Sequence, residues 1–194
     1  MGKAAKGMCL ALVAAVAAWA AESVTIQLRH NSEREMRTKM ELERILNFFD
    51  LRKYTFTNKI IIEDRAVAHS FPVITLNTRF LNSDDELLSS YLHEQLHWHL
   101  RNHHRQTEEA IGRLRILYPR VPVGMPEGAE TEYSTYGHLV DCYLEIQADR
   151  KLIGAERTIA AINHKGHYTW IYDTIFRDEV KIAAIVERNG LGIN

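Results

Sequence analysis

Cysteine is scarce in this chain of 194 residues, in which only Cys9 and Cys142 occur. Cys9 lies in an N-terminal segment that we expect to be removed, so Cys142 has no partner for an internal disulfide. Cys142 stands in an apolar stretch of helical pattern, where a buried and inert thiol is expected rather than a reactive one. The disulfide-rich extracellular scaffolds are therefore excluded.

An excess of charge of one sign is also lacking, because 24 Lys+Arg stand against 25 Asp+Glu. This balance predicts no strongly basic face and therefore no nucleic-acid partner. The hydrophobic (46%) and charged (25%) fractions are those of a soluble globular protein, and the length suffices for one domain with a sizeable core. No repeat, low-complexity tract or linker divides the chain.

Long hydrophobic runs are absent, and the one apolar run of note is MCLALVAAVAA at residues 8–18. Two lysines precede this run, and the tripeptide Ala-Trp-Ala at 18–20 fits a small-x-small cleavage site. The run is too short and too rich in alanine for a membrane span. We expect residues 1–20 to be a signal peptide and 21–194 to be one exported domain, periplasmic or extracellular. This domain has no stable membrane insertion after cleavage, and an uncleaved anchor is the alternative.

Hydrophobic periodicity predicts a small sheet followed by helices. Strands are expected at 24–28, 54–56, 59–62 and 71–76. Helices are expected at 32–49 (opened by a Ser32–Glu35 capping box), 83–103, 106–117, 132–152, 156–162 and 169–187. Because Pro72 cannot donate to a sheet, the last strand is expected at an edge. The pattern predicts an α+β fold, with the sheet packed on a central helix at 83–103 and a helical C-terminal half.

The helix expected at 83–103 carries the sequence His93-Glu94-Gln95-Leu96-His97. Two histidines four apart on a helix stand about 6 Å apart along its axis and nearly in line, so both imidazoles can bind one Zn²⁺. Glu94 then points toward a water on the open side of the metal. A cation, a bound water and a base together predict hydrolysis of a peptide bond.

A catalytic zinc site needs a third protein ligand, and the sequence offers two candidates. Glu145 opens an ExxAD sequence and shares a helical face with Asp149, so one carboxylate can bind zinc while the other accepts a hydrogen bond from a ligand histidine. His103 completes an HExxHxxxxxH spacing, but in an unbroken helix it lies roughly 9 Å beyond His97. Leu100 stands where that spacing needs a helix-breaking glycine. We therefore expect Glu145 to be the third zinc ligand and Asp149 to accept a hydrogen bond from one of the ligand histidines.

The HExxH and ExxAD motifs together resemble those of gluzincins, the zincin metallopeptidases with a glutamate as third zinc ligand. The resemblance covers about residues 71–150, and the chain is similar in size to the minimal "minigluzincin" type. It implies a zincin-like fold whose edge strand holds the substrate extended, zinc as cofactor, and a peptide or protein substrate. His99 departs from the pattern, which has an apolar residue there. We expect His99, His103 and His104 at the surface or at a helix end.

We hypothesise that zinc on His93, His97 and Glu145 polarises a water and the scissile carbonyl, while Glu94 moves the proton to the leaving amine. The tetrahedral oxyanion needs a further donor, and the resemblance implies a histidine and a tyrosine. The candidates for this role are Tyr136, His138, His167 and Tyr168. The sequence does not choose among them.

Two alternatives to an enzyme stay open. A non-catalytic zincin-fold protein could bind peptide or metal, but it has no chemical need for Glu94. A metal-storing protein could use the histidine cluster from His93 to His104, and it would then bind more than one ion per chain. The enzyme needs one.

Overall fold

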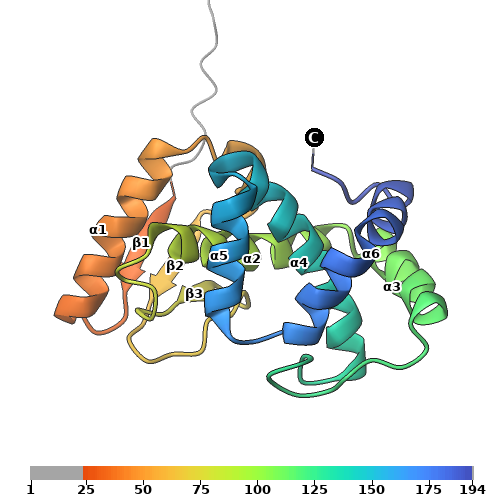
Figure 1. The fold of residues 1–194 in the computed structure, drawn as a ribbon. Helices are drawn as coiled ribbons and strands as arrows, with labels where there is room; N and C mark the ends of the chain where they lie inside the picture. The colour runs from red at the N-terminus through yellow and green to blue at the C-terminus, as the bar shows by residue number, and fades with distance from the viewer. Residues whose placement is uncertain (1–23, 194) are drawn as a thin grey trace, which may run out of the picture.

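The computed structural model describes residues 24–193, so the signal peptide expected at 1–20 lies outside the described residues. Within this range the chain forms six α-helices and a three-stranded parallel sheet, the α+β architecture that periodicity predicts (Figure 1). No helix among these residues is long and apolar enough to cross a membrane. The elements are β1 (Thr25–Leu28), α1 (Glu33–Phe48), the 3-10 helix η1 (Arg52–Tyr54), β2 (Lys59–Ile62), β3 (Ile74–Leu76), α2 (Asp84–Asn102), α3 (His104–Leu117), α4 (Glu132–Ile153), α5 (Ala155–Lys165) and α6 (Thr169–Arg188).

The three strands lie in the order β1-β2-β3, with Ile26 opposite Ile60 and Ile60 opposite Ile74. α1 forms the crossover between β1 and β2 that parallel neighbours require. β3 is an edge strand, as predicted, although it is shorter than the expected span. The chain before β3 turns back, and Thr75 exchanges two backbone hydrogen bonds with His69, of 2.8 and 3.0 Å. The outer edge of β3 is therefore covered at this point.

The strand predicted at 54–56 is wrong, because Arg52–Tyr54 forms η1 instead. The backbone N–H groups of Phe56 and Thr57 donate to the Gln95 side-chain oxygen at 2.7 and 3.0 Å. A glutamine of α2 thus takes the donors that a strand would offer to a neighbour. The β-prone side chains of this segment serve packing against α2 rather than strand pairing.

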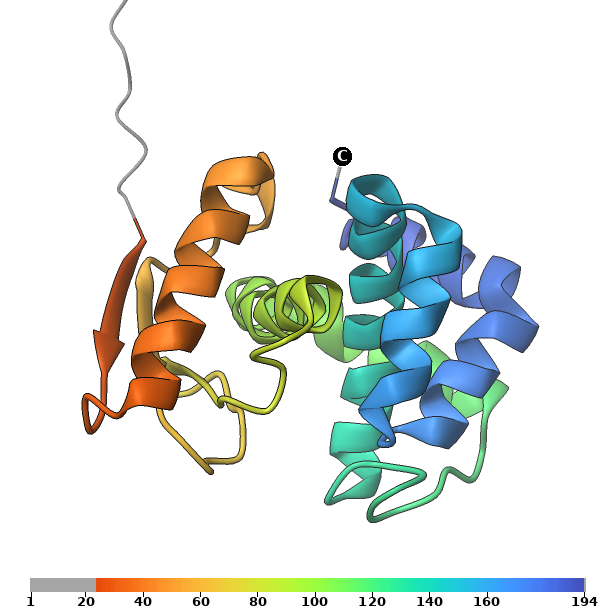
Figure 2. The same cartoon turned by 60° about the vertical axis from the view of Figure 1, so that its left-hand side comes forward.

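α2 lies between the two halves of the molecule, and Figure 2 looks almost along its axis. The sheet and α1 form one hydrophobic core with its N-terminal half, and α3, α4 and α6 form a second core with its C-terminal half. The α2 side chains in the first core are Leu87, Leu88, Tyr91 and Leu92, and those in the second are Leu96 and Leu100. The helix is central and largely buried, as its sequence predicts, and the HExxH motif lies where the two halves meet.

His99 is buried, with 5% of its surface exposed, which contradicts the expected surface position. Its ring packs on Phe56 with the centroids 4.8 Å apart, and its Nε2 lies 2.9 Å from the Leu191 carbonyl oxygen. The residues after α6 cover this face of α2, and such a long-range contact has no local signal. His103 and His104 do lie at the end of α2, and His104 is exposed.

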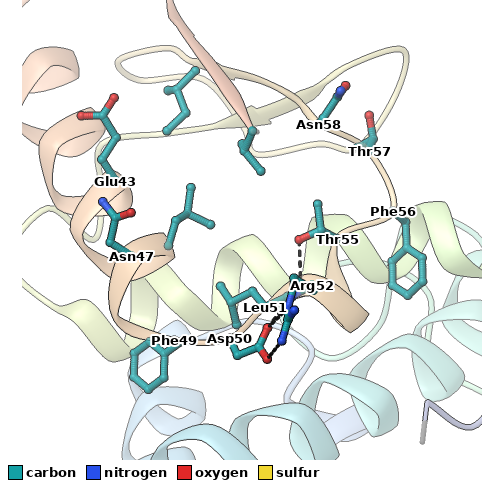
Figure 3. A pocket seen from close by; sticks show the side chains of 13 residues that line it. Glu43, Asn47, Phe49, Asp50, Leu51, Arg52, Thr55, Phe56, Thr57 and Asn58 are labelled. Atoms are coloured by element: carbon teal, nitrogen blue, oxygen red, sulfur yellow. Dashed lines mark hydrogen bonds and ion pairs between the residues drawn. The ribbon is translucent and has the colours of Figure 1, made fainter. Parts of the chain in front are cut away.

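A cavity of about 790 Å³, larger than the cleft of about 600 Å³ that Glu94 lines, lies between α1, β1 and the segment after α1 (Figure 3). Glu43, Asn47, Phe49 and Asp50 contribute to its walls, but none of the predicted site residues does. Size therefore does not locate the functional site in this protein.

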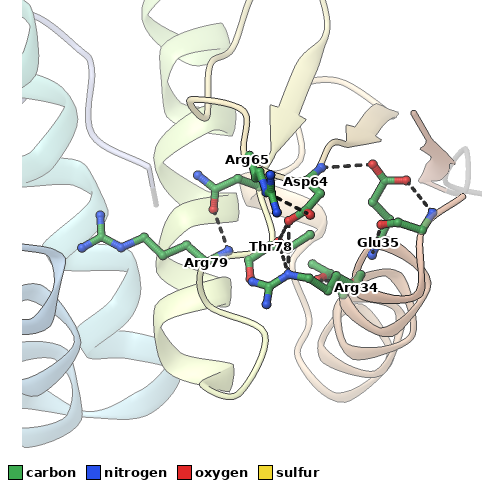
Figure 4. A network of polar contacts seen from close by, with 9 residues as sticks. Arg34, Glu35, Asp64, Arg65, Thr78 and Arg79 are labelled. Carbon is green, nitrogen blue, oxygen red and sulfur yellow. Dashed lines mark hydrogen bonds and ion pairs between the residues drawn. The ribbon is translucent and has the colours of Figure 1, made fainter. Parts of the chain in front are cut away.

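The Glu35 carboxylate is buried in the first turn of α1 and accepts hydrogen bonds from three backbone N–H groups (Figure 4). The donors are His30 at 2.9 Å, Ser32 at 3.2 Å and Asp64 at 3.0 Å. The bond from Ser32 completes the predicted capping box. Burial raises the pKa of Glu35, but these hydrogen bonds outweigh it, and the pKa lies below its ordinary 4.5. Glu35 thus connects the β1–α1 turn to the end of β2.

We expect Glu35→Ala to lower the free energy of unfolding by about 2 kcal/mol at neutral pH, because three buried donors lose their acceptor. The ionised carboxylate stabilises the fold above the unfolded-state pKa and ceases to do so as pH falls through the lower folded-state pKa. The difference between parent and variant should therefore shrink in acid. Urea denaturation of parent and variant at neutral and acidic pH measures this difference in unfolding free energy. A difference that stays the same in acid would contradict stabilisation by the ionised carboxylate.

Candidate metal centre

Three imidazoles meet where α4 crosses α2. His93 and His97 project from one face of α2 with ring centroids 4.9 Å apart, as their spacing predicts. His138 of α4 completes the group, at 5.5 Å from the His93 ring and 4.9 Å from the His97 ring. One nitrogen from each ring lies within 4.8 Å of the others. This group could hold a metal ion.

The Nδ1 atom of each ring faces an oxygen. His93 Nδ1 lies 2.9 Å from Asp141 Oδ2 and 3.0 Å from Glu145 Oε2. His97 Nδ1 lies 3.7 Å from Asp141 Oδ1, and His138 Nδ1 lies 2.7 Å from the Ser134 carbonyl oxygen. An imidazole whose Nδ1–H is held from behind offers Nε2 to a metal. The three rings are therefore oriented as a set of metal ligands would be.

Asp141 is a site residue that the sequence analysis missed. Its carboxylate is fully buried on α4, and no described group donates a well-aligned hydrogen bond to either oxygen. Burial raises its pKa, but the nearby His97 and His93 outweigh burial and lower it, which keeps the group ionised. A buried carboxylate whose near partners are the imidazole nitrogens of His93 and His97 needs positive charge on those rings. Imidazoles polarised by a bound cation would supply that charge, so the residues present fit a metal.

The electrostatics of the rings agree with a cation site. Burial lowers the pKa of His93, but Asp141 outweighs burial and raises it well above 6.5, so positive charge is stabilised at this ring. Burial and the neighbouring His97 and His93 lower the pKa of His138 to about 3. His138 is therefore neutral and keeps a lone pair for a metal.

Glu145, the expected third ligand, lies behind His93 rather than beside His97. Its Oε1 accepts from the Ser89 hydroxyl at 2.6 Å and forms a short contact with the Lys165 ammonium. Its Oε2 accepts from the Tyr172 hydroxyl and from His93 Nδ1, each at 3.0 Å. A second candidate metal group contains Glu145 with His93, Asp141 and Cys142, but no group among residues 24–193 joins Glu145 to His97.

Asp149 does not make the expected contact with a histidine. Its Oδ2 lies 2.6 Å from the Ser89 hydroxyl oxygen, and its Oδ1 has no hydrogen-bond partner among the described residues. Burial and the Glu145 charge raise the pKa of Asp149 to about 8, so the group is protonated at neutral pH. The position behind His93 belongs to Glu145 and Asp141, which lie one and two helical turns nearer the start of α4 than Asp149.

Lys165 and Cys142 are both buried beside this group. The Lys165 side chain is 3% exposed and forms an ion pair with Glu145. No sequence motif pointed to Lys165. Cys142 is a free thiol, and it is buried, as predicted; burial raises its pKa to about 11.

Glu94 lines a cleft of about 600 Å³ together with His167, Tyr168 and His93, which is the ring of the metal group that this cleft reaches. Its Oε2 accepts a hydrogen bond from the Ser70 hydroxyl at 2.5 Å. The Ser70 carbonyl in turn accepts from Trp98 Nε1 at 2.9 Å, which fixes the loop before β3 on α2. Ser70 is a second site residue that the sequence did not reveal. Its hydroxyl occupies Oε2 of Glu94 and does not occupy Oε1.

The four predicted oxyanion donors divide into two groups. Tyr168 and His167 line the cleft, and the Tyr168 ring lies 4.4 Å from His138 and stacks 6.0 Å from His93. Tyr168 adopts a left-handed backbone conformation, with φ of 56°, which is uncommon for a bulky residue. Tyr136 is fully buried, and its hydroxyl donates to the Tyr118 carbonyl, so it does not reach the site. His138 belongs to the metal group.

His103 takes no part in the metal group. α2 is unbroken to Asn102, and Nδ1 of His103 lies 2.9 Å from the His99 carbonyl oxygen. No candidate metal group of the described residues contains His99, His103 or His104.

Comparisons with protein-family models, with curated proteins and with solved structures found no match for this chain. The geometry and chemistry of the site are therefore the basis for a functional proposal.

Proposed function

We propose that this chain is a zinc peptidase with a zincin-like fold, in which His93, His97 and His138 hold the metal. The observation that carries the proposal is that α2 and α4 bring three imidazoles together beside Glu94, the acidic residue next to the first ligand. Three imidazoles that each offer a nitrogen, with a fourth position left for water, suit catalytic zinc. The edge position of β3 and the order of HExxH helix and third-ligand helix also support a zincin-like fold.

This ligand set differs from that of the gluzincins in its third member. The Glu145 carboxylate accepts contacts from four groups and compensates the charge of the Lys165 ammonium. Binding a metal would break these contacts, so Glu145 is a poor candidate for the third ligand. We assign to Glu145 and Asp141 the role that the sequence suggested for Asp149, which is to hold ligand histidines from behind. The HExxH part of the resemblance is retained.

When bound, zinc would supply a Lewis acid that polarises the scissile carbonyl and acidifies an attacking water. Glu94 takes the proton of that water and passes it to the leaving amine. Ser70 fixes Oε2 of Glu94, which directs Oε1 toward the water. Tyr168, which lines the same cleft, donates its hydroxyl proton in a hydrogen bond to the developing oxyanion, with His167 as the neighbouring alternative.

The substrate backbone lies along the segment that covers β3. Because His69 occupies the outer edge of β3 at Thr75, the expected free edge strand is not available there. Ala66, Val67 and Ala68 of the covering segment line the cleft instead. An extended peptide beside these residues would run past Glu94 and the metal ligands.

Neither alternative function has a specific observation in its favour. Metal storage by the histidines between 93 and 104 is disfavoured because His99 is buried against the C-terminal residues and His104 points into solvent. A non-catalytic binding module would leave the Ser70–Glu94 contact without a purpose.

Zinc analysis of His138→Ala and Glu145→Gln tests the proposal. We expect the metal-replete parent to contain about one zinc per chain, because the three histidines form a single binding site. His138→Ala should lose most of the metal, whereas Glu145→Gln should keep it with about 10- to 100-fold weaker affinity, as expected for a residue behind a ligand. Mass spectrometry gives the content, and competition with a chelator gives the affinity.

The opposite pattern would restore Glu145 as the third ligand. Zinc would then be retained in His138→Ala and lost in Glu145→Gln. A metal-replete parent without zinc would refute the peptidase proposal itself.

A further inference from the structure

Three guanidinium groups line the cleft that also contains Glu94, His93, His167 and Tyr168. Arg34 comes from α1, Arg65 from the segment after β2 and Arg79 from the segment after β3. The carboxylates that line the same cleft are Asp64 and Glu94, and Glu94 is the proposed base. Positive charge is thus concentrated here in a chain whose formal net charge is −1. A cleft lined by charge of one sign attracts ligands of the other.

Asp64 neutralises Arg34 but not the other two. Its Oδ1 lies 3.2 Å from Arg34 Nε and accepts a short hydrogen bond from the Thr78 hydroxyl (Figure 4). The Thr78 hydrogen bond, followed by Arg34, lowers the pKa of Asp64 against the effect of burial, so the group is ionised. Arg65 lies 3.9 Å away, with 92% of its side chain exposed, and this is a weak surface contact.

Arg79 is held in place by neutral groups only. Its Nη2 donates to the Lys165 carbonyl oxygen at 3.1 Å, and its guanidinium lies 5.3 Å from the centre of the Phe80 ring. No carboxylate among residues 24–193 forms an ion pair with it, and the nearby Asp64 pairs with Arg34 and makes only the weak contact with Arg65. Figure 4 shows the side chain extended away from the Asp64 network toward the helices of the C-terminal half.

Arg79 is exposed, but its side chain is held by a hydrogen bond and a ring contact. A surface arginine gains little from one fixed geometry, because ordering its side chain costs rotamer entropy. The contact with Lys165 joins segments 86 residues apart and places the guanidinium in the cleft that contains His93 and Glu94. The remaining N–H groups of its planar fork match a carboxylate, which accepts two parallel hydrogen bonds.

We propose that Arg79 binds a carboxylate of the peptide substrate next to the metal centre, with Arg34 and Arg65 adding positive potential. This inference rests on the proposed peptidase function and names its substrate class. The carboxylate belongs either to the C-terminus of the peptide or to an aspartate or glutamate side chain near the scissile bond. The two sources share one chemistry and are separated by experiment.

Binding of three labelled peptides to the zinc-loaded Glu94→Gln chain tests the proposal without turnover. The peptides share one neutral sequence and end in a free carboxylate, in a carboxamide, or in a carboxamide with one internal glutamate. Fluorescence anisotropy gives each Kd. We expect one of the two acidic peptides to bind about tenfold tighter than the neutral carboxamide, as a charge-assisted bidentate contact provides. A preference for the free acid assigns a terminal carboxylate, and a preference for the glutamate peptide assigns a side chain.

Arg79→Gln, made in the same background, should remove this preference, and Arg79→Lys should restore part of it. Arg113→Gln, an exposed arginine of α3, is the matched control and should leave the preference unchanged. A preference that survives in Arg79→Gln would overturn the proposal. Equal binding of all three peptides, with cleavage by the parent chain, would overturn the carboxylate site and leave the peptidase. If the parent neither cleaves nor binds any peptide, both proposals fail.

Discussion

Glu94→Gln should abolish peptide hydrolysis while leaving zinc bound. The amide cannot take a proton from the attacking water, and loss of a general base costs about 10²- to 10⁴-fold in rate. Glutamine has nearly the shape of glutamate, and its amide oxygen can still accept the Ser70 hydrogen bond. Glu94 is in neither candidate metal group, so the metal should stay. The measurements are kcat/KM on a mixture of fluorogenic peptides and zinc content by mass spectrometry.

Glu109→Gln is the matched control for this substitution. Glu109 is an exposed carboxylate of α3, engaged in a surface pair with Arg105 at 3.8 Å. It makes the same chemical change far from the cleft, and we expect activity equal to that of the parent. Substantial hydrolysis by Glu94→Gln would refute the mechanism, because no other carboxylate that lines the cleft lies against the metal group. Loss of zinc from Glu94→Gln would instead make Glu94 a ligand.

The contacts around Glu94 explain why its orientation does not depend on the metal alone. Ser70 is 4% exposed and holds one carboxylate oxygen, while Trp98 of the same helix holds the Ser70 backbone. Helix α2 thus positions its own base through the loop before β3. A base fixed in this way needs less reorganisation when substrate arrives.

Helix positions followed from the sequence because their signals are local. The Ser32 capping box and the apolar stripe through Leu42 and Ile45 gave α1 to within a residue or so. The pair His93 and His97 was equally predictable, since four residues on one helix fix their separation. The strand at 54–56 failed because the Gln95 side chain, distant in sequence, takes its backbone donors.

The third ligand was not predictable from periodicity alone. His138, Asp141, Glu145 and Asp149 follow one another at spacings of three and four residues and share one face of α4. Periodicity identifies this stripe, but the crossing of α4 over α2 decides which turn meets His97. Lys165 and Ser70 come from a helix end and a loop, where neither residue belongs to a motif. This stripe was visible in the sequence, so it could have identified His138 and Asp141 as further candidate site residues.

Lys165→Met should destabilise the fold by about 3–5 kcal/mol, because it removes the ammonium that pairs with the buried Glu145 carboxylate and leaves only His93 opposite it. Burial lowers the pKa of Lys165, but Glu145 and then Asp149 outweigh burial and raise it, so the amine is charged in the folded chain. Burial likewise raises the pKa of Glu145, while Lys165 and His93 lower it overall. Each charge therefore depends on the other for compensation. Denaturant titration of the zinc-free chain measures the loss without a contribution from metal binding.

Lys39→Met is the surface control, because Lys39 forms an exposed pair with Glu43 one turn along α1, at 3.7 Å. Such pairs contribute little, and we expect a change within about 0.5 kcal/mol.

The double variant Glu145→Gln/Lys165→Met separates the charge from the contact. Replacing both members of a buried ion pair removes two desolvation costs together, so the double variant should be more stable than Lys165→Met alone. The single amide oxygen of the glutamine can still accept from Ser89 or from Tyr172, which donate to different oxygens of Glu145, so one of these two donors keeps its acceptor. If the two losses simply add, the pair has no electrostatic coupling, and Lys165 serves only to fill space beside α4. A double variant close to the parent would instead mean that the buried charges contribute little to folding, and that the pair acts by holding Glu145 behind His93.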